Sequence, residues 1–475
     1  MYKSQKINIL GLGPLIYEGC VKMISSNIFR AYDIRGIYGL DINEDVAKLI
    51  GKAIAAYAGD KYKTFVVGRD VRLSSKPLCD ALVSGMISGG LNVEDIGVVT
   101  TPLLYFATKY YGMNGGVMIS ASHNPPEWNG FKILLDKGFI CMGMGMEDLR
   151  DIALKGLFRE MKPGTVKINP NAIKDYEEYI SEKININEGF KIAVDPGGGS
   201  CTVLIPEIYE RVNVNAHTIY GEPDGTFSKH PPEPNEETLR ELRGLILERK
   251  ADFGVGFDAD GDRAIFIDDK GHVVPSNLIL ALLSKHYLSK NRGAAIVYEV
   301  SCSMTVEETI KAYGGKPILS RVGHTYIYDK MIRENAVLGG ETSGHFYFRD
   351  VYCFDDAIYA SLKVAEAISE DGRKLSEIID SLPRYPQIPA KSYDCPDEKK
   401  FRVVDELAEE FNSLGYKTIT IDGVKVITDD GWFLIRPSNT QPLIRLTVEG
   451  KDEEKLKKLA SFAEESILRK IRESL

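Results

Sequence analysis

The chain has 475 residues, of which 44% are hydrophobic and 27% are charged. This length predicts several domains, because a domain usually holds about 100–200 residues. The formal net charge of −9 argues against nucleic acid or an anionic membrane as the main partner. Seven cysteines without a C-x-x-C pair favour free thiols in a reducing compartment, and no apolar run reaches the ~20 residues of a membrane span. We therefore expect a cytoplasmic protein.

Residues 1–26 form an extension whose structure the sequence leaves uncertain. Gly11-Leu12-Gly13 begins like a dinucleotide-binding loop, but Ile16 stands where the third glycine is needed. A short apolar patch resembles a secretory signal, yet glycine and proline interrupt it and no small-residue cleavage site follows. We expect Met23 to be the working initiator.

A strand–helix–strand unit occurs three times in the next part of the chain. The units begin with apolar strands near Thr64, Lys191 and Ala294, and each leads through a helix to a further strand. This repetition predicts three α/β layers. In the second unit, Gly197-Gly198-Gly199 could cradle phosphate but lacks the lysine of a P-loop, so a tight turn is the preferred interpretation. Further on, Asn235 predicts the start of a helix that ends at a basic pair, 249–250.

The pattern changes from about Tyr385 onward. A predicted helix, 401–414, precedes four alternating strands at 418–421, 424–427, 432–436 and 443–448, with Asp-Gly hairpin turns between them. A final helix, 456–471, follows. We therefore predict three successive α/β/α domains followed by a smaller α+β domain with an antiparallel sheet. The expected boundaries are 27–168, 169–272, 273–384 and 385–475.

The stretch from Gly116 to Lys132 reads GVMISASHNPPEWNGFK. An apolar strand stops before Ser122 and His123, and two prolines force the chain outward as a loop. Reactive side chains at a strand's end are presented to solvent by a rigid scaffold. We expect a second turn at Asn129-Gly130, with Lys132 as a cation close by. An ordinary polar strand-to-loop junction is the alternative.

Three aspartates alternate in FGVGFDADGDRAIFIDD, between two apolar strands. Alternation places Asp258, Asp260 and Asp262 on one side of an extended segment. Oxygen ligands without histidine or cysteine suit Mg²⁺. An EF-hand is disfavoured because Arg263 occupies the position that requires glycine and because strands flank the motif. A solvated turn remains the other alternative.

Two further loops offer polar groups to a ligand. In Leu338–His345, glycines flank Glu341 and Ser343, so the backbone can approach sugar hydroxyls closely. In Arg436–Pro442, an arginine suited to bidentate phosphate binding precedes hydroxyl and amide side chains. Taken alone, each loop is also compatible with an ordinary turn.

The segment ISASHNPPEWNGFK resembles the phosphoserine loop of the α-D-phosphohexomutases, most closely the phosphomannomutase/phosphoglucomutase branch. IFRAYDIRGIYG, the aspartate loop, GETSGH and RPSNTQP resemble other motifs of this family in the expected order, from Ile28 to the C-terminus. The resemblance implies four domains around one central cleft. It also implies a phosphorylated Ser122 and one Mg²⁺ bound by Ser122, Asp258, Asp260 and Asp262.

The same resemblance assigns roles to individual residues. The implied catalytic residues are Ser122, His123, Arg35, Lys132, Arg263 and His324. The implied substrate-binding residues are Tyr32, Glu341, Ser343, His345, Arg436, Ser438, Asn439 and Thr440. Ser301 stands where many relatives have lysine, so no role is carried over to that position.

The resemblance implies interconversion of hexose 1-phosphate and hexose 6-phosphate, with a hexose 1,6-bisphosphate as intermediate and activator. A phosphoglucosamine mutase of the same family is the main alternative, although Asn439-Thr440 follows the phosphomannomutase/phosphoglucomutase version of the loop. A metal-dependent sugar phosphatase would gain nothing from a second phosphate loop. A silent sugar-phosphate sensor would be expected to have lost the serine or an aspartate. The sequence does not fix the oligomeric state.

Overall fold

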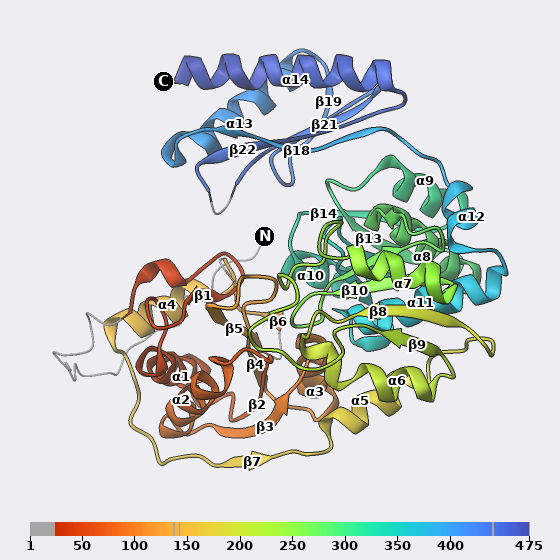
Figure 1. Cartoon of the computed structure of the whole chain (residues 1–475). Helices are drawn as coiled ribbons and strands as arrows, with labels where there is room; N and C mark the ends of the chain where they lie inside the picture. The colour runs from red at the N-terminus through yellow and green to blue at the C-terminus, as the bar shows by residue number, and fades with distance from the viewer. Residues whose placement is uncertain (1–23, 136–137, 142, 439–440, 475) are drawn as a thin grey trace.

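A computed structural model describes residues 24–135, 138–141, 143–438 and 441–474 (Figure 1). The predictions for Gly11–Gly13 and Met23, and those for Asn439 and Thr440, lie outside these ranges. Four sheets divide the chain into consecutive units. Figure 1 shows the first three units packed together, with the fourth beyond the third. Within the described ranges, no helix combines the length and the apolar character needed to cross a membrane.

The first sheet has the order β1-β5-β4-β2-β3-β7, with β6 paired to β5. Its strands are β1 (Ile34–Ile37), β2 (Thr64–Arg69), β3 (Asn92–Val98), β4 (Gly115–Ile119), β5 (Trp128–Leu135), β6 (Gly138–Phe139) and β7 (Val166–Ile168). The helices are α1 (Glu44–Ala58), α2 (Ser75–Ser88), α3 (Thr101–Tyr110) and α4 (Met146–Lys155). Because β2 and β4 run parallel, their carboxyl ends meet at one edge, where Asp70 N donates to Ile119 O at 2.9 Å.

The predicted turn at Asn129-Gly130 is wrong, because both residues lie inside β5. The Asn129 amide donates to the hydroxyls of Ser74 and Ser75 at 2.8 and 2.9 Å. A side chain at Gly130 would collide with Ile34 O, since a Cβ there would lie 2.2 Å away. The pair therefore permits close packing of three strands, and the chain reverses direction earlier, around Pro125-Pro126.

The second and third sheets repeat the predicted strand–helix–strand unit. The second has the order β12-β11-β10-β8-β9 and the third β14-β13-β15-β16-β17. Their strands are β8 (Lys191–Asp195), β9 (Asn215–Thr218), β10 (Phe253–Phe257), β11 (Ala264–Ile267), β12 (Val273–Val274), β13 (Ala295–Glu299), β14 (Lys316–Ser320), β15 (Leu338–Gly340), β16 (Phe346–Phe348) and β17 (Phe354–Asp355). The helices are α5 (Ala172–Ser181), α6 (Ile205–Arg211), α7 (Arg240–Arg249), α8 (Ser276–Lys290), α9 (Met304–Ala312), α10 (His324–Glu334), α11 (Ala357–Asp371) and α12 (Leu375–Asp380).

One helix boundary in the second unit differs from the prediction. Helix α7 begins at Arg240, not at Asn235. The Asn235 side chain accepts hydrogen bonds from Glu237 N and Thr238 N at 2.9 and 3.1 Å. The Asn235 side chain therefore stabilises a short turn before α7 and does not cap the first turn of that helix.

The fourth unit is the predicted α+β domain, with the antiparallel order β18-β22-β21-β20-β19. Its elements are β18 (Gln387–Asp394), α13 (Asp397–Ser413), β19 (Lys417–Ile419), β20 (Val424–Thr428), β21 (Gly431–Pro437), β22 (Leu443–Gly450) and α14 (Glu453–Ser474). Strand β18 was not predicted. It is an edge strand whose pairing with β22 shifts register between Ile388 and Lys391, around Pro389, and edges and bulges are where strands tolerate proline.

The fourth domain docks on the third through buried contacts. Lys425 Nζ donates to Val300 O at 2.8 Å, and Glu449 Oε1 accepts Met304 N at 2.8 Å. Trp432 and Leu434 pack against Val300 in a small apolar cluster. The predicted fold class, three α/β/α domains followed by an α+β domain, is confirmed.

Candidate active site

Ser122 lies three residues after the end of β4 and is only 1% exposed, so the expectation of a solvent-exposed serine is wrong. Its Oγ lies 2.9 Å from Asp258 Oδ2 and 3.2 Å from His123 Nδ1. The backbone of Ser122 has a φ of +51°, a left-handed conformation that non-glycine residues rarely adopt. The loop after β4 therefore turns its serine toward the second domain, across 136 positions of sequence.

Arg35, at the edge strand β1, reaches the same loop. Its Nη1 donates to Asn124 Oδ1 at 2.7 Å and to Ala121 O at 3.2 Å, while its Nε is 2.8 Å from Asp33 Oδ2. Arg35 therefore lies beside the Ser122 loop and contacts it at two oxygen atoms. One carboxylate and one amide hold its guanidinium in place.

The three predicted metal ligands lie together after β10, and all three are buried. Oxygen atoms of Asp258, Asp260 and Asp262 lie within 4.8 Å of one another. Asp258 Oδ1 accepts the N–H groups of Gly261, Asp262 and Arg263 at 3.1–3.2 Å. Gly261 makes this turn possible with a φ of +74°. The carboxylates lie together, as predicted, but a tight turn at residues 259–262 brings them together, not alternation along an extended segment.

Lys132 projects from β5 into this cluster. Its Nζ lies 2.8 Å from Asp260 Oδ2 and 2.5 Å from Asp262 Oδ2. Burial alone would lower the pKa of Lys132, but the two carboxylates outweigh it and hold that pKa well above its usual value. For the carboxyl group of Asp258 the effect of burial is the opposite. Burial raises its pKa, and the negative charges of Asp262 and Asp260 raise it further. One lysine does not neutralise three buried carboxylates.

The cluster fits a hard divalent cation. Asp260 Oδ1 and Asp262 Oδ1 are buried and have no hydrogen-bond partner among the described residues. Unpaired buried carboxylate oxygens are costly unless a cation or a donor satisfies them. Three oxygen donors without a thiolate match the preference of Mg²⁺.

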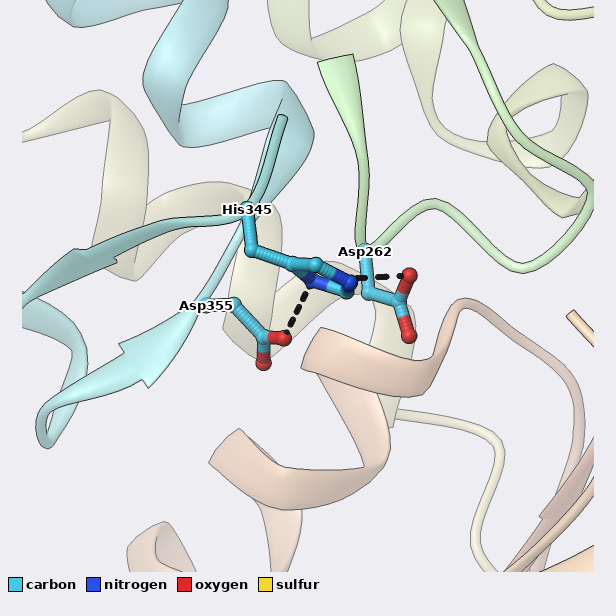
Figure 2. Close-up of side chains that lie close together, drawn as sticks. All are labelled: Asp262, His345 and Asp355. Atoms are coloured by element: carbon cyan, nitrogen blue, oxygen red, sulfur yellow. Dashed lines mark hydrogen bonds and ion pairs between the residues drawn. The ribbon is translucent and has the colours of Figure 1, made fainter. Parts of the chain in front are cut away.

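Figure 2 shows Asp262 beside His345 and Asp355, which come from the third domain. His345 Nδ1 lies 2.8 Å from Asp355 Oδ2 and 3.8 Å from Asp262 Oδ1. Arg263 Nε lies 2.9 Å from His345 Nε2, the ring nitrogen that does not face Asp355. The imidazole therefore joins the third domain to the aspartate loop through both nitrogens.

Two more histidines lie near the cluster. Burial, together with the positive charges of Arg263 and Arg35, lowers the pKa of His123 to about 2. Burial likewise holds the pKa of His324 well below its usual value, with Lys132 adding to the effect. The His324 ring, at the start of α10, stands edge-on to Phe139 and Tyr32 at centroid distances of 5.0 and 5.5 Å. Both imidazoles are neutral at ordinary pH.

The loop after β15 buries its glutamate, Glu341, and exposes its serine, Ser343. Glu341 is buried, and its two oxygens accept Gly323 N at 2.8 Å and Tyr347 Oη at 2.5 Å. Ser343 is exposed. Between them, Thr342 N donates to Glu299 Oε1 at 2.8 Å. The loop is therefore fixed at Glu341 and Thr342, while the Ser343 hydroxyl is open to solvent.

Ser301 and Tyr32 reach this region from two sides. Ser301 Oγ donates to Glu299 Oε1 at 2.9 Å, so Ser301 supports the glutamate that fixes Thr342. From the first domain, Tyr32 Oη donates to Val322 O at 3.2 Å. Side chains of the first and third domains thus meet next to the Glu341 loop.

The proposed phosphate loop follows β21. The Arg436 guanidinium pairs with Asp422 at 2.8 Å, and Ser438 is buried, with its Oγ accepting Gln441 N at 3.2 Å. The ion pair joins the end of β21 to the turn between β19 and β20 of the same domain.

Sequence reasoning missed several residues that order the site. The clearest are Asp70, Arg72, Thr101, Glu299, Asp355 and Asp422. Thr101 Oγ1, in the first turn of α3, donates to Asp260 Oδ2 at 2.6 Å. Charged residues directly after the apolar strand β2 were a usable signal for Asp70 and Arg72. The partners of Thr101 and Asp355 are remote in sequence, so no local pattern identifies them.

Family comparisons match almost the whole chain. The phosphoglucomutase/phosphomannomutase alpha/beta/alpha domains I, II and III match residues 26–157, 174–271 and 275–385. The C-terminal domain of the same family matches residues 393–466.

Individual proteins are similar over the same extent. A phosphoglucomutase/phosphomannomutase of Thermococcus kodakarensis is 34% identical over 90% of this chain and 95% of its own length. A phosphoglucosamine mutase of Methanocaldococcus jannaschii is 33% identical over 90% and 96%. The crystal structure of a phosphoglucomutase/phosphomannomutase family protein from Burkholderia thailandensis superposes with a TM-score of 0.88 at 30% identity, covering 94% of this chain and 98% of that one.

Proposed function

The chain belongs to the phosphoglucomutase/phosphomannomutase family of α-D-phosphohexomutases, and we propose that it interconverts hexose 1- and 6-phosphates through phosphorylated Ser122. Members of this family are intramolecular phosphotransferases of the isomerase class. One observation carries the proposal. A serine hydroxyl of the first domain lies 2.9 Å from the aspartate cluster of the second, with Lys132 on the other two carboxylates. A serine beside carboxylates that can hold Mg²⁺, with a lysine next to them, suits phosphoryl transfer, in which bound cations offset the charge of the transferring group.

In the proposed reaction, the phosphoryl group leaves Ser122 Oγ for the free hydroxyl of a bound hexose phosphate. The P–O bond to the serine breaks and a P–O bond to the sugar forms, while the sugar hydroxyl loses a proton and Ser122 Oγ gains one. The resulting 1,6-bisphosphate turns over within the cleft and returns its other phosphate to Ser122. The same bisphosphate, supplied from outside, would phosphorylate an empty Ser122 and so act as the activator.

Asp258, Asp260 and Asp262 are the proposed ligands of one Mg²⁺ per active site, together with an oxygen on Ser122. When bound, the cation neutralises charge on the transferring phosphoryl group. Lys132, Arg35 and Arg263 add positive charge around Ser122. This assignment agrees with the unpaired buried oxygens of Asp260 and Asp262.

His123 and His324 are the proposed proton carriers. His123 Nδ1 is 3.2 Å from Ser122 Oγ, so it is the imidazole that takes part at the serine. A pKa of about 2 makes it a weak base, which suits a reaction driven mostly by positioning and electrostatics.

Hexose recognition is assigned to Tyr32, Glu341, Ser343 and His345, and binding of the non-reacting phosphate to Arg436, Ser438, Asn439 and Thr440. Glu341 uses one acceptor site on each oxygen, and a carboxylate has about four, so it can still accept sugar hydroxyls. We also propose a cytoplasmic setting, in agreement with the six described cysteines, all free and buried.

A phosphoglucosamine mutase is the second candidate. The Methanocaldococcus relative of that name is about as similar as the Thermococcus relative, at 33% against 34% identity. Overall sequence identity therefore does not distinguish a hexose phosphate from a glucosamine phosphate as the substrate. The residues that bind the sugar must make this distinction.

Incubation with radiolabelled glucose 1-phosphate, Mg²⁺ and glucose 1,6-bisphosphate tests the proposal. A mutase yields labelled glucose 6-phosphate, a phosphatase yields free phosphate, and a binding protein leaves the sugar phosphate unchanged. Free phosphate as the main product, or no turnover at all, would contradict the proposed function.

A further inference from the structure

We propose that Arg72 is a positioning residue that holds the Ser122 loop in its reactive conformation. The proposal rests on the role proposed for Ser122 and adds a residue that no motif in the sequence singled out. The left-handed φ of +51° at Ser122 is a conformation that persists only where neighbouring contacts over-determine it.

Arg72 contacts the loop at three backbone carbonyls. Its Nη2 donates to Ser122 O and to Asn124 O, each at 2.6 Å, and its Nη1 donates to Pro125 O at 2.6 Å. A single planar guanidinium thus binds three of the four carbonyls from Ser122 to Pro125. This geometry fixes the path of the chain on both sides of His123.

The Arg72 side chain is itself anchored. Its Nε lies 3.0 Å from Asp70 Oδ2, and neither of these two side chains has any exposed surface. Asp70 Oδ1 accepts the Ser75 hydroxyl at 2.5 Å, which connects the pair to the start of α2. Because Arg72 has no exposed surface, it acts through the loop and does not contact the substrate.

A loop of the second domain closes over Arg72. The Phe227 ring centroid lies 5.0 Å from Arg72 Cζ, a cation–π arrangement. Gly225 approaches so closely that a Cβ there would lie 2.4 Å from Val71 O. Asp258 belongs to this same domain, so Arg72 couples the position of Ser122 to the domain that carries its carboxylate partner.

Lysine cannot replace this arginine. Its ammonium group is a compact charge and lacks the planar fork that spans several carbonyl oxygens. Arg72→Lys therefore retains a charge for Asp70 but loses the simultaneous contacts to the loop. Arg69→Lys is the matched control, because Arg69 ends β2 three residues before Arg72 and pairs with Asp95 at 3.4 Å, away from the Ser122 loop.

The experiment follows phosphorylation of dephosphorylated enzyme by glucose 1,6-bisphosphate with intact-mass analysis, alongside steady-state kinetics. For Arg72→Lys we expect the phosphorylation rate and kcat to fall at least tenfold, with KM for glucose 1-phosphate within threefold of wild type. Arg69→Lys should retain wild-type rates. A folded Arg72→Lys protein with wild-type phosphorylation, or one in which only KM changes, would overturn the proposal.

Phe227→Ala provides a second variant in case Arg72→Lys does not fold. Removing the ring lets water compete for the guanidinium, so kcat should fall at least threefold with KM unchanged. In that case a wild-type kcat in Phe227→Ala overturns the proposal. Failure of the wild-type enzyme to gain any phosphate on Ser122 is a different result, because it would refute the proposed function and not the role of Arg72 alone.

Discussion

The guanidinium of Arg436 lies 2.8 Å from a carboxylate oxygen of Asp422. The same oxygen accepts the backbone N–H of Val322 at 3.1 Å, so one acidic side chain connects the proposed phosphate loop to the third domain. Arg436 Nε is buried without a hydrogen-bond partner in the described part of the chain. A phosphate bound at this loop would satisfy the donor that Asp422 leaves open.

We therefore expect Arg436→Ala to raise KM and to lower kcat in steady-state assays with glucose 1-phosphate. The lost charge-assisted contact is worth roughly 1.5–3 kcal/mol, or about ten- to hundredfold in kcat/KM. The kcat effect arises because the non-reacting phosphate also orients the sugar. Arg402→Ala, at an exposed position on α13 paired with Glu406, should behave as wild type. An unchanged kcat/KM in Arg436→Ala would place Arg436 outside the site.

Ser122→Ala should lower mutase turnover by several orders of magnitude, because it removes the hydroxyl that lies 2.9 Å from Asp258. The fold should survive, since one buried oxygen is removed and the loop keeps its arginine contacts. Intact-mass analysis should find one phosphate on wild type and on Ser84→Ala, a change at an exposed position of α2, and none on Ser122→Ala. Robust turnover by Ser122→Ala would refute the assignment of the nucleophile.

Treatment with a chelator should abolish turnover, and added Mg²⁺ should restore it. In Asp258→Asn, half-maximal activity should require at least tenfold more Mg²⁺, because one of three hard ligands becomes neutral. Asp252→Asn is the control. Asp252 lies just before β10, the strand that leads to Asp258, and its carboxylate accepts Lys191 N. An unaltered Mg²⁺ requirement in Asp258→Asn would argue against the aspartate loop as the metal site.

The enzyme should accept both mannose and glucose phosphates, with kcat/KM values within about two decades, and glucosamine phosphate more slowly. Glu341 and Ser343 are expected to contact the 3- and 4-hydroxyls, whereas mannose and glucose differ only at carbon 2. A site that does not bind carbon 2 cannot discriminate strongly, because strong rejection needs a buried polar group left unpaired. The three 6-phosphates are compared under identical Mg²⁺ and activator concentrations. If glucosamine 6-phosphate proves the best substrate, the phosphoglucosamine mutase alternative is correct.

Acid should weaken the contact between α11 and α8. Burial alone would raise the pKa of Glu366, but hydrogen bonding to His286 and the charge of Lys363 lower it to about 2. A carboxyl with a lowered folded-state pKa stabilises the protein above its unfolded value, here 4.5, and loses that contribution as pH falls toward 2. Glu366→Gln should lower Tm at pH 7, and the difference from wild type should narrow below pH 4.5. Glu370→Gln, on the more exposed next turn of α11, should have a smaller effect; a Glu366→Gln difference independent of pH would contradict this account.

The sequence alone predicted the order of the domains and most of the proposed site. Strand–helix–strand repeats and Asp-Gly hairpins are local signals, because hydrophobic periodicity and turn chemistry act over a few residues. The alternating aspartates and the Arg436 loop are likewise short motifs. Ser122 was found in this way, but its exposure was not, because burial of a loop depends on the domain that packs over it.

Tertiary structure decided how the motifs are joined. Asn129-Gly130 reads as a turn in isolation, yet packing between β1 and β4 places it inside a strand. In the sequence, Arg72 is one polar residue after a strand. Only in the folded protein does it bind three backbone carbonyls of the Ser122 loop and pack against the ring of Phe227. Hydrogen bonds and ion pairs depend on distance in space, which sequence separation does not encode. The motifs could therefore be recognised in the sequence, whereas the contacts that orient them form only when the four domains pack together.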